Sequence, residues 1–271
     1  LTFISTKVLI NHGLTPQEIF FYRFLIAYLG IWVISPKRLF TNNWQDELWL
    51  VAGGIFGGSL YFFTENTALG ITQASNVSFI ICTAPLLTTI LSLLFYKSEK
   101  ASKGLIYGSL LALMGVGLIV FNGSFVLKIS PIGDLLTLLA ALSWAFYSLI
   151  IKKMAGRYPT IFITRKIFFY GVLTILPAFL LHPLHPDTAV LLHPAVLFNL
   201  LFLAVLASLI CYVHWNVVLK QLGTVRASNY IYLNPLVTMI ASFLILDEKI
   251  TLVALGGAAC IVCGVYWAEK K

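Results

Sequence analysis

Long apolar stretches separated by short polar connections form the main pattern of this chain. A helix needs roughly 17–25 predominantly apolar residues to cross a bilayer. Breaks at charges, prolines and Gly-Asn clusters predict nine such segments, at residues 17–35, 48–69, 74–96, 105–121, 133–151, 161–181, 195–219, 227–246 and 251–268. The opening residues "LTFISTKVLI" supply about half of a further span, so we expect ten transmembrane helices with the first one incomplete in this chain.

The composition supports an all-α membrane protein. Hydrophobic residues make up 59% of the chain and charged residues 10%, and the mean hydropathy is +0.93. Soluble domains typically contain about 25% charged and about 45–50% apolar residues, so a large soluble core does not explain this sequence. We expect the lipid bilayer to be its first partner.

The basic residues predict the orientation. A net charge of +8 could indicate a nucleic-acid binder. With the N-terminus in the cytoplasm and the sides alternating, the inner loops and the C-terminus hold twelve Lys and Arg residues: Lys37, Arg38, Lys97, Lys100, Lys103, Lys152, Lys153, Arg157, Lys220, Arg226, Lys270 and Lys271. The outer loops hold only Lys128 and Lys249. Because cytoplasmic loops carry an excess of Lys and Arg, the charge is assigned to topology, with both termini cytoplasmic and no nucleic-acid partner.

The two halves of the chain show a weak internal repeat. The stretch "STKVLINHGLTPQEIFFYR" aligns with "SLIIKKMAGRYPTIFITRK" at an offset of 143, which pairs Arg23 with Lys166. Further along, an offset of 150 pairs Asn66 with Asn216. Self-similarity between two parts of a chain indicates that the fold is built from repeated units.

The repeat predicts two units, at residues 1–128 and 129–271, with five helices each. An odd number of helices forces the second unit to run opposite to the first, which gives an inverted-topology repeat. Inverted repeats are typical of secondary transporters, whose substrate sites lie near the bilayer midplane. A duplication retained only for folding is the alternative.

At these residues the sequence resembles the EamA family of the drug/metabolite transporter superfamily. The resemblance rests on "STKVLINHGLTPQEIFFYRFLIA", "TALGITQASNVSFIICTAPLLTTILSLLFYKSEKAS" and "GTVRASNYIYLNPLVTMIASFLILDEKIT". The family pattern places a proline in mid-helix, here Pro85 and Pro235, and an acidic residue at the helix end, here Glu99 and Glu248. The resemblance covers nearly the whole chain. It implies a ten-helix carrier of the bacterial inner membrane that exports amino acids or other small metabolites and is not an enzyme.

Glu65 and Arg23 are the most informative polar residues. An ionisable side chain near the centre of a span costs about 2.5–3.5 kcal/mol and usually marks function. At a rise of 1.5 Å per residue, Glu65 lies about 6 Å and Arg23 about 9 Å inside the outer ends of their spans. They form either a structural ion pair, with Arg23 also able to snorkel to the headgroups, or a site where Glu65 meets a substrate amine or a coupling proton.

The alignment of the two halves places this carboxylate in the first half only. Glu65 aligns with Trp215, whereas its neighbour Asn66 aligns with Asn216. The carboxylate is therefore not a symmetric structural element.

Lys166 matches Arg23 but has no acid in the aligned helix. We expect this unpaired cation either to snorkel to the cytoplasmic interface or to meet a substrate carboxylate. Arg165 faces another side of the helix and is expected to point to headgroups.

Further polar and aromatic residues recur one helical turn apart. Packing is the simpler explanation for any single aromatic side chain, but together they suit a cavity for an amphipathic metabolite. The candidate residues for binding substrate or a proton are Glu65, Asn66, Arg23, Tyr61, Lys166, Trp215, Asn216, Tyr230, Asn234 and Tyr147. Pro85 and Pro235 remove backbone hydrogen bonds in mid-helix and are expected to kink their helices near this site.

The sequence predicts no metal and no cofactor. Cys260 and Cys263 form a C-x-x-C within an apolar run that lacks His and acidic residues, which favours packing. His182, His185 and His193 lie in a proline-rich outer loop and form only a weak metal hypothesis. The chain has no G-x-x-x-x-G-K-[ST] motif for a nucleotide.

The leading hypothesis is a secondary transporter that exports small metabolites by alternating access, with a proton as candidate coupling ion. A lipid or sugar-lipid flippase or a channel on the same fold stays open, and an intramembrane enzyme is the least favoured class. We expect a monomer or a weak homodimer.

Overall fold

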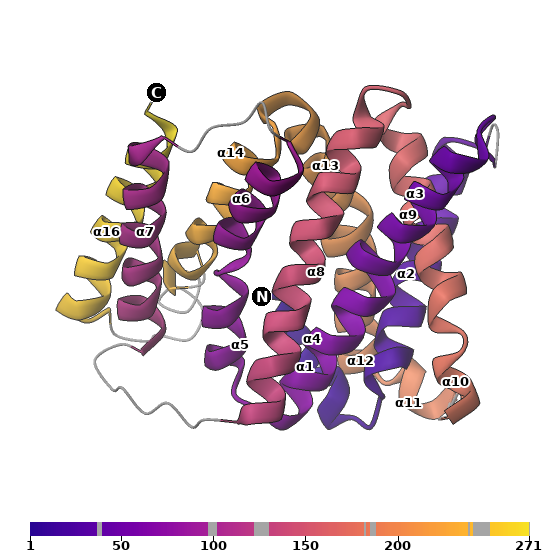
Figure 1. The fold of residues 1–271 in the computed structure, drawn as a ribbon. Coiled ribbons are helices and arrows are strands. Elements are labelled where there is room, and N and C mark those ends of the chain that lie inside the picture. Colours follow the sequence, from indigo (N-terminus) through magenta and orange to yellow (C-terminus); the bar gives the residue numbers. More distant parts are fainter. Residues whose placement is uncertain are drawn as a thin grey trace.

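The computed structural model describes residues 1–36, 40–96, 102–121, 130–181, 183–184, 188–237, 239–240 and 250–270. Within these ranges every regular element is helical (Figure 1). The first part of the chain forms α1 (Thr2–Asn11), α2 (Pro16–Ile34), α3 (Trp44–Gly54), the π-helical segment Ile55–Ser59, α4 (Leu60–Ile71), α5 (Ala74–Ile81), α6 (Ala84–Phe95) and α7 (Lys103–Phe121). The second part forms α8 (Pro131–Ala155), α9 (Thr160–Ile175), α10 (Ala178–Leu181), α11 (Thr188–Leu192), α12 (Pro194–Leu201), the π-helical segment Phe202–Ile210, α13 (Cys211–Leu222), α14 (Thr224–Asn229), the 3₁₀ turn Tyr230–Leu233 and α16 (Leu252–Glu269).

Seven helices of the described residues are long and apolar enough to cross a membrane. They are Pro16–Ile34, Ala74–Phe95, Lys103–Phe121, Pro131–Ala155, Thr160–Leu180, Pro194–Leu222 and Leu252–Glu269. The all-α membrane class is therefore confirmed, whereas the number ten stays a prediction. The expected span 48–69 is continuously helical but is not among the seven, and 227–246 lies in large part outside the described residues.

A capping box fixes the start of α2 and thereby the depth of Arg23. The Thr15 side chain accepts a hydrogen bond from the Glu18 backbone N–H at 3.4 Å, and the Glu18 carboxylate accepts one from the Thr15 backbone N–H at 2.9 Å. Pro16 occupies the first turn, where its missing N–H has no intrahelical partner to lose. Arg23 then lies two turns into the helix.

Both mid-helix prolines lie next to irregular backbone. α5 ends at Ile81, two turn residues follow, and α6 begins with Pro85 in its first turn. Pro235 lies two residues after the end of the 3₁₀ turn Tyr230–Leu233, in the helical residues 234–237. A proline cannot donate a backbone hydrogen bond in a helix interior, so each proline interrupts the regular helical hydrogen-bond pattern of its segment.

The helices α7 and α16 pack side by side at one edge of the molecule, away from α2, α3 and α9 (Figure 1). Glycines allow this close approach. A Cβ atom on Gly108 would lie 2.4 Å from the Gly264 carbonyl oxygen, and one on Gly115 would lie 2.5 Å from the Gly257 carbonyl oxygen. Small residues at four- or seven-residue spacing are the usual means of close helix contact in membranes.

The largest buried cluster lies between α2, α4, α8, α9 and α13. Its aromatic centre consists of Phe20, Phe24, Phe62, Tyr147, Phe168 and Tyr212. A second, smaller apolar cluster joins α1 and α2 to α12 and the π-helical segment that follows it; it consists of Leu9, Leu14, Ile19, Val196, Leu200 and Leu203. We call this second group the apolar cluster.

Candidate functional site

A cavity of about 470 Å³ lies against the aromatic centre. Six of the predicted binding residues line it: Arg23, Tyr61, Glu65, Trp215, Tyr230 and Asn234. They come from α2, α4, α13, the 3₁₀ turn and the residues just after it. The volume lies within the range of about 300–1,000 Å³ that is usual for small-molecule sites.

Glu65 is buried, with 5% of its surface exposed, and lies one turn after Tyr61 on α4. The Tyr61 hydroxyl donates a hydrogen bond to its Oε1 atom at 2.6 Å. This spacing of four residues places both side chains on one face of the helix. The helix thus presents a carboxylate and its donor together to the cavity.

Arg23 is held by a different set of contacts. Its Nε–H donates to the Ser208 hydroxyl at 2.9 Å, and its guanidinium lies 4.1 Å from the centre of the Phe62 ring. Arg23 and Glu65 therefore line one cavity with opposite charges, yet no hydrogen bond or ion pair joins them among the residues described. The carboxylate and the guanidinium each keep capacity for a further partner.

Two aromatic residues that sequence reasoning left out of the binding set complete the wall. Trp144 packs against Tyr61 and Trp215, with ring centroids 5.0 and 5.9 Å apart. Tyr212 lines the cavity and donates its hydroxyl hydrogen bond to the Gly57 carbonyl in the π-helical segment Ile55–Ser59. For Tyr212 the sequence offers one signal: it lies four residues from Ser208, which holds Arg23, and four residues from Asn216, which holds Tyr147.

The other predicted polar residues do not line the cavity. Asn66 is fully buried, and its amide donates to the Pro16 carbonyl at 3.2 Å, which ties α4 to the start of α2. Tyr147 donates to the Asn216 Oδ1 atom at 2.6 Å, and the Asn216 amide donates to the Thr164 hydroxyl at 2.9 Å. These contacts connect α8, α13 and α9, so they hold the walls of the site in place.

The expectation that Lys166 is an unpaired cation is wrong. Its ammonium group forms a buried ion pair with Glu47 of α3, and Tyr170 donates a hydrogen bond to the same carboxylate. Glu47 lies just before the predicted span 48–69, so the apolar pattern gives no sign that it reaches Lys166. The expectation for Arg165 is wrong as well, because its side chain is fully buried and donates to the Ser35 carbonyl at the end of α2.

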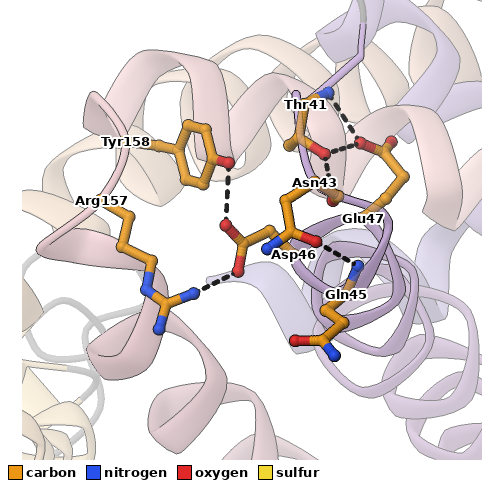
Figure 2. A network of polar contacts seen from close by, with 7 residues as sticks. All are labelled: Thr41, Asn43, Gln45, Asp46, Glu47, Arg157 and Tyr158. Carbon is orange, nitrogen blue, oxygen red and sulfur yellow. Dashed lines mark hydrogen bonds and ion pairs between the residues drawn. The ribbon is translucent and has the colours of Figure 1, made fainter.

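Lys166 belongs to a network that we call the α3 cluster: Thr41, Asp46, Glu47, Arg157, Tyr158, Lys166 and Tyr170. Figure 2 shows its part around Asp46, whose carboxylate pairs with Arg157 and accepts a hydrogen bond from the Tyr158 hydroxyl at 2.9 Å. Glu47 also accepts hydrogen bonds from the Thr41 backbone N–H and hydroxyl, at 2.8 and 2.6 Å (Figure 2). Burial raises the pKa of Glu47, but the hydrogen bonds from Lys166, Thr41 and Tyr170 outweigh it and lower this pKa to about 2.

The described residues contain no group of three or more His, Cys, Asp and Glu side chains that could hold a metal ion. His193 packs against His12 with ring centroids 5.0 Å apart, whereas His182 and His185 lie outside the described residues. Cys260 and Cys263 both lie within α16. The acidic residues Glu99 and Glu248 of the sequence motif also fall outside the described residues.

The profile of the EamA-like transporter family matches residues 1–121 and 131–268. The chain belongs to this family. A protein of Archaeoglobus fulgidus named "Uncharacterized transporter" is 30% identical over all of this chain and 93% of its own length. A protein of Escherichia coli (strain K12) named "Probable amino-acid metabolite efflux pump" is 24% identical over 98% of this chain and 89% of its own length.

A solved crystal structure shares the fold of this EamA protein. It superposes with a TM-score of 0.75 at 18% identity, and the match covers 99% of this chain and 93% of that one. The family and the apolar helices together make the chain a multi-pass membrane transporter and not an enzyme.

Proposed function

We propose that this EamA protein exports small zwitterionic metabolites, foremost amino acids with apolar or aromatic side chains, through the cavity between α2, α4 and α13. The observation that carries this proposal is the pair of opposite charges, Arg23 and Glu65, in one aromatic-lined cavity without a direct bond between them. The ammonium group of an amino acid fits Glu65 and its carboxylate fits Arg23. The rings of Trp144 and Trp215 supply an apolar surface for the side chain.

Two features of the helices support the ten-helix inverted repeat as part of this proposal. The π-helical segments Ile55–Ser59 and Phe202–Ile210 overlap at the offset of 150 residues. Gly108 approaches Gly264 while Gly115 approaches Gly257, and at an offset of 149 Gly108 matches Gly257 and Gly115 matches Gly264. Reciprocal contacts of this kind are those that a two-fold axis produces. The two ranges matched by the family profile agree with units 1–128 and 129–271.

The orientation in the proposal follows the basic residues. With both termini in the cytoplasm, the starts of α3 and α9 lie at the inner face of the bacterial cytoplasmic membrane, and the starts of α2, α8 and α12 at the outer face. Glu65 then carries either the substrate amine or, when no substrate is bound, a coupling proton. This exchange of partners at one carboxylate is a simple way to couple export to proton entry.

Counterflow in proteoliposomes tests the proposed function. Vesicles loaded with unlabelled L-phenylalanine should accumulate radiolabelled L-phenylalanine, and phenethylamine, which lacks the carboxylate, should compete at least about tenfold more weakly because one charge-assisted contact is lost. Counterflow also separates a carrier from a channel, which does not show it. L-leucine and L-threonine serve as further probes of the side-chain pocket.

Two substitutions locate the activity in the cavity. Glu65→Gln and Arg23→Gln remove one charge each and should lower counterflow about tenfold or more. Glu269→Gln, on α16 and outside the cavity lining, is the matched control and should keep counterflow unchanged. Full counterflow in both cavity variants would show that substrates do not bind between these charges.

A further inference from the structure

The α3 cluster joins the start of α3 to α9 and to the turn between α8 and α9. Adjacent residues of α3, Asp46 and Glu47, pair with two different cations, Arg157 and Lys166. The Glu47 and Lys166 side chains are 8% and 0% exposed, whereas Arg157 is 52% exposed. The cluster therefore has one buried ion pair and one half-exposed ion pair across the same junction. Figure 2 shows the half-exposed pair, Asp46–Arg157.

A tight seam lies directly behind these ion pairs. A Cβ atom on Gly53 would lie 2.5 Å from the Ile167 Cδ1 atom, and one on Gly54 would lie 2.5 Å from the Tyr170 Cβ atom. Bare glycine backbone on α3 therefore packs against side chains of α9. Separating α3 from α9 at this end requires that both ion pairs break first.

The repeat relates this junction to one at the opposite end of the molecule. The offset of 150 maps Asp46 onto Val196, and the offset of 143 maps Arg157 onto Leu14. Val196 and Leu14 are both buried in the apolar cluster, between α12 and the elements α1 and α2. Where one end of the molecule joins its halves by ion pairs, the related end joins them by apolar contact.

We propose that the α3 cluster is an ionic gate that closes the cytoplasmic end of the transport pathway, and that the apolar cluster is its outer counterpart. This rests on the proposed function and orientation. Neutralising the acids of α3 weakens only the inner closure, because the outer one contains no charge to remove. Removing one partner of a buried ion pair leaves the other charge buried without compensation, and this strongly disfavours the closed form.

Cysteine labelling of the purified protein in detergent tests the gate without any substrate. In a variant lacking the four native cysteines, Ile167→Cys reports on the inner seam and Leu203→Cys on the apolar cluster; both native side chains are fully buried. The double substitution Asp46→Asn and Glu47→Gln should raise the labelling rate at Ile167→Cys by about tenfold or more. The rate at Leu203→Cys should stay unchanged or fall.

Two further variants separate the contributions of the two ion pairs from a general loss of charge. Arg157→Gln removes the half-exposed pair alone and should raise labelling at Ile167→Cys by a smaller factor. Exchange of the charges, Glu47→Lys with Lys166→Glu, should return labelling toward that of the parent protein.

Unchanged labelling at Ile167→Cys in both the double variant and Arg157→Gln would overturn the gate. Equal increases at both reporters would overturn it too, because they would show loosening of the whole fold. Loss of counterflow with every probe would count against the proposed function while leaving a selective rise at Ile167→Cys intact, so the two failures are distinguishable.

Discussion

The carboxylates of Glu47 and Glu65 lie on neighbouring helical segments, but they accept different numbers of hydrogen bonds. Glu47 accepts from four donors: the Thr41 backbone N–H and hydroxyl, Lys166 and Tyr170. Glu65 accepts one hydrogen bond, from Tyr61, among the described residues. A carboxylate offers about four acceptor positions, so the acceptor positions of Glu47 are filled by the protein, whereas Glu65 has room for a ligand or a proton.

The hydrogen bonds of Glu47 predict a pH dependence of stability. Its pKa is about 2 in the folded protein and about 4.3 in an unfolded chain. The ionised form therefore stabilises the fold fully above about pH 5, and this contribution is lost as the pH falls from about 4 through about 2. Glu47→Gln should lower the melting temperature in detergent at pH 7, and the difference from the parent should shrink between pH 5 and pH 2.5.

Comparison with the parent removes the effect of every other carboxylate, because those titrate in both proteins. A difference in melting temperature that stays constant down to pH 2.5 would contradict the assigned environment of Glu47.

The sequence predicted the cavity better than the α3 cluster. Arg23, Tyr61 and Glu65 were found because polar groups within an apolar run are conspicuous. Glu47 was missed as a partner of Lys166 because it stands outside the apolar run, 119 residues away in the chain (166 − 47), and only the crossing of α3 and α9 brings the two together.

At the scale of elements, the length of the apolar runs predicts where the spans lie. The irregular turns within the spans are seen only in the three-dimensional structure. The segment Phe202–Ile210 is π-helical, but it contains neither proline nor glycine and only one polar residue, Ser208, so its residue types do not mark the irregularity. Pro85 did mark its break, because a proline cannot continue a hydrogen-bonded helix. π-helical turns in helices often occur at functional sites, and Ile55–Ser59 contacts the cavity wall through Tyr212.

The contact between α7 and α16 predicts opposite effects for two adjacent glycines. A Cβ atom on Gly257 would lie 2.7 Å from the Gly115 carbonyl oxygen, whereas one on Gly256 would meet nothing within 4 Å. Gly257→Ala should therefore destabilise the protein by about 1–3 kcal/mol through overpacking. Gly256→Ala should stabilise it by about 0.5–1 kcal/mol because alanine favours the helix.

The melting temperatures of both variants in the same detergent, or their unfolding by a denaturing detergent, measure this difference. Equal effects of the two substitutions would show that α7 and α16 do not pack through these glycines.

At the scale of the whole molecule, the same two junctions between the halves have different chemistry. Asp46 and Arg157 make an ion pair at one end. Val196 and Leu14, which the proposed repeat relates to them, both lie in the buried apolar cluster at the other end. Under the proposed inverted repeat, the side chains at related positions therefore differ in chemistry. Glu65, which aligns with Trp215, is a further such departure, and it lies in the cavity.

An inverted repeat requires that related turns lie on opposite sides of the membrane. Gly13, in the turn between α1 and α2, is related by the offset of 143 to Gly156, in the turn between α8 and α9. Gly13 has a φ of +94°, which disfavours substitution there, so its exposed neighbour His12 is the better reporter.

In a cysteine-free background, a membrane-impermeant thiol reagent should label His12→Cys and spare Gly156→Cys in intact cells. Inverted vesicles should give the opposite pattern, since Gly156 then faces the reagent. Labelling of both positions from the same side would mean that the two halves run parallel, and the ionic gate could not then be assigned to the cytoplasmic face.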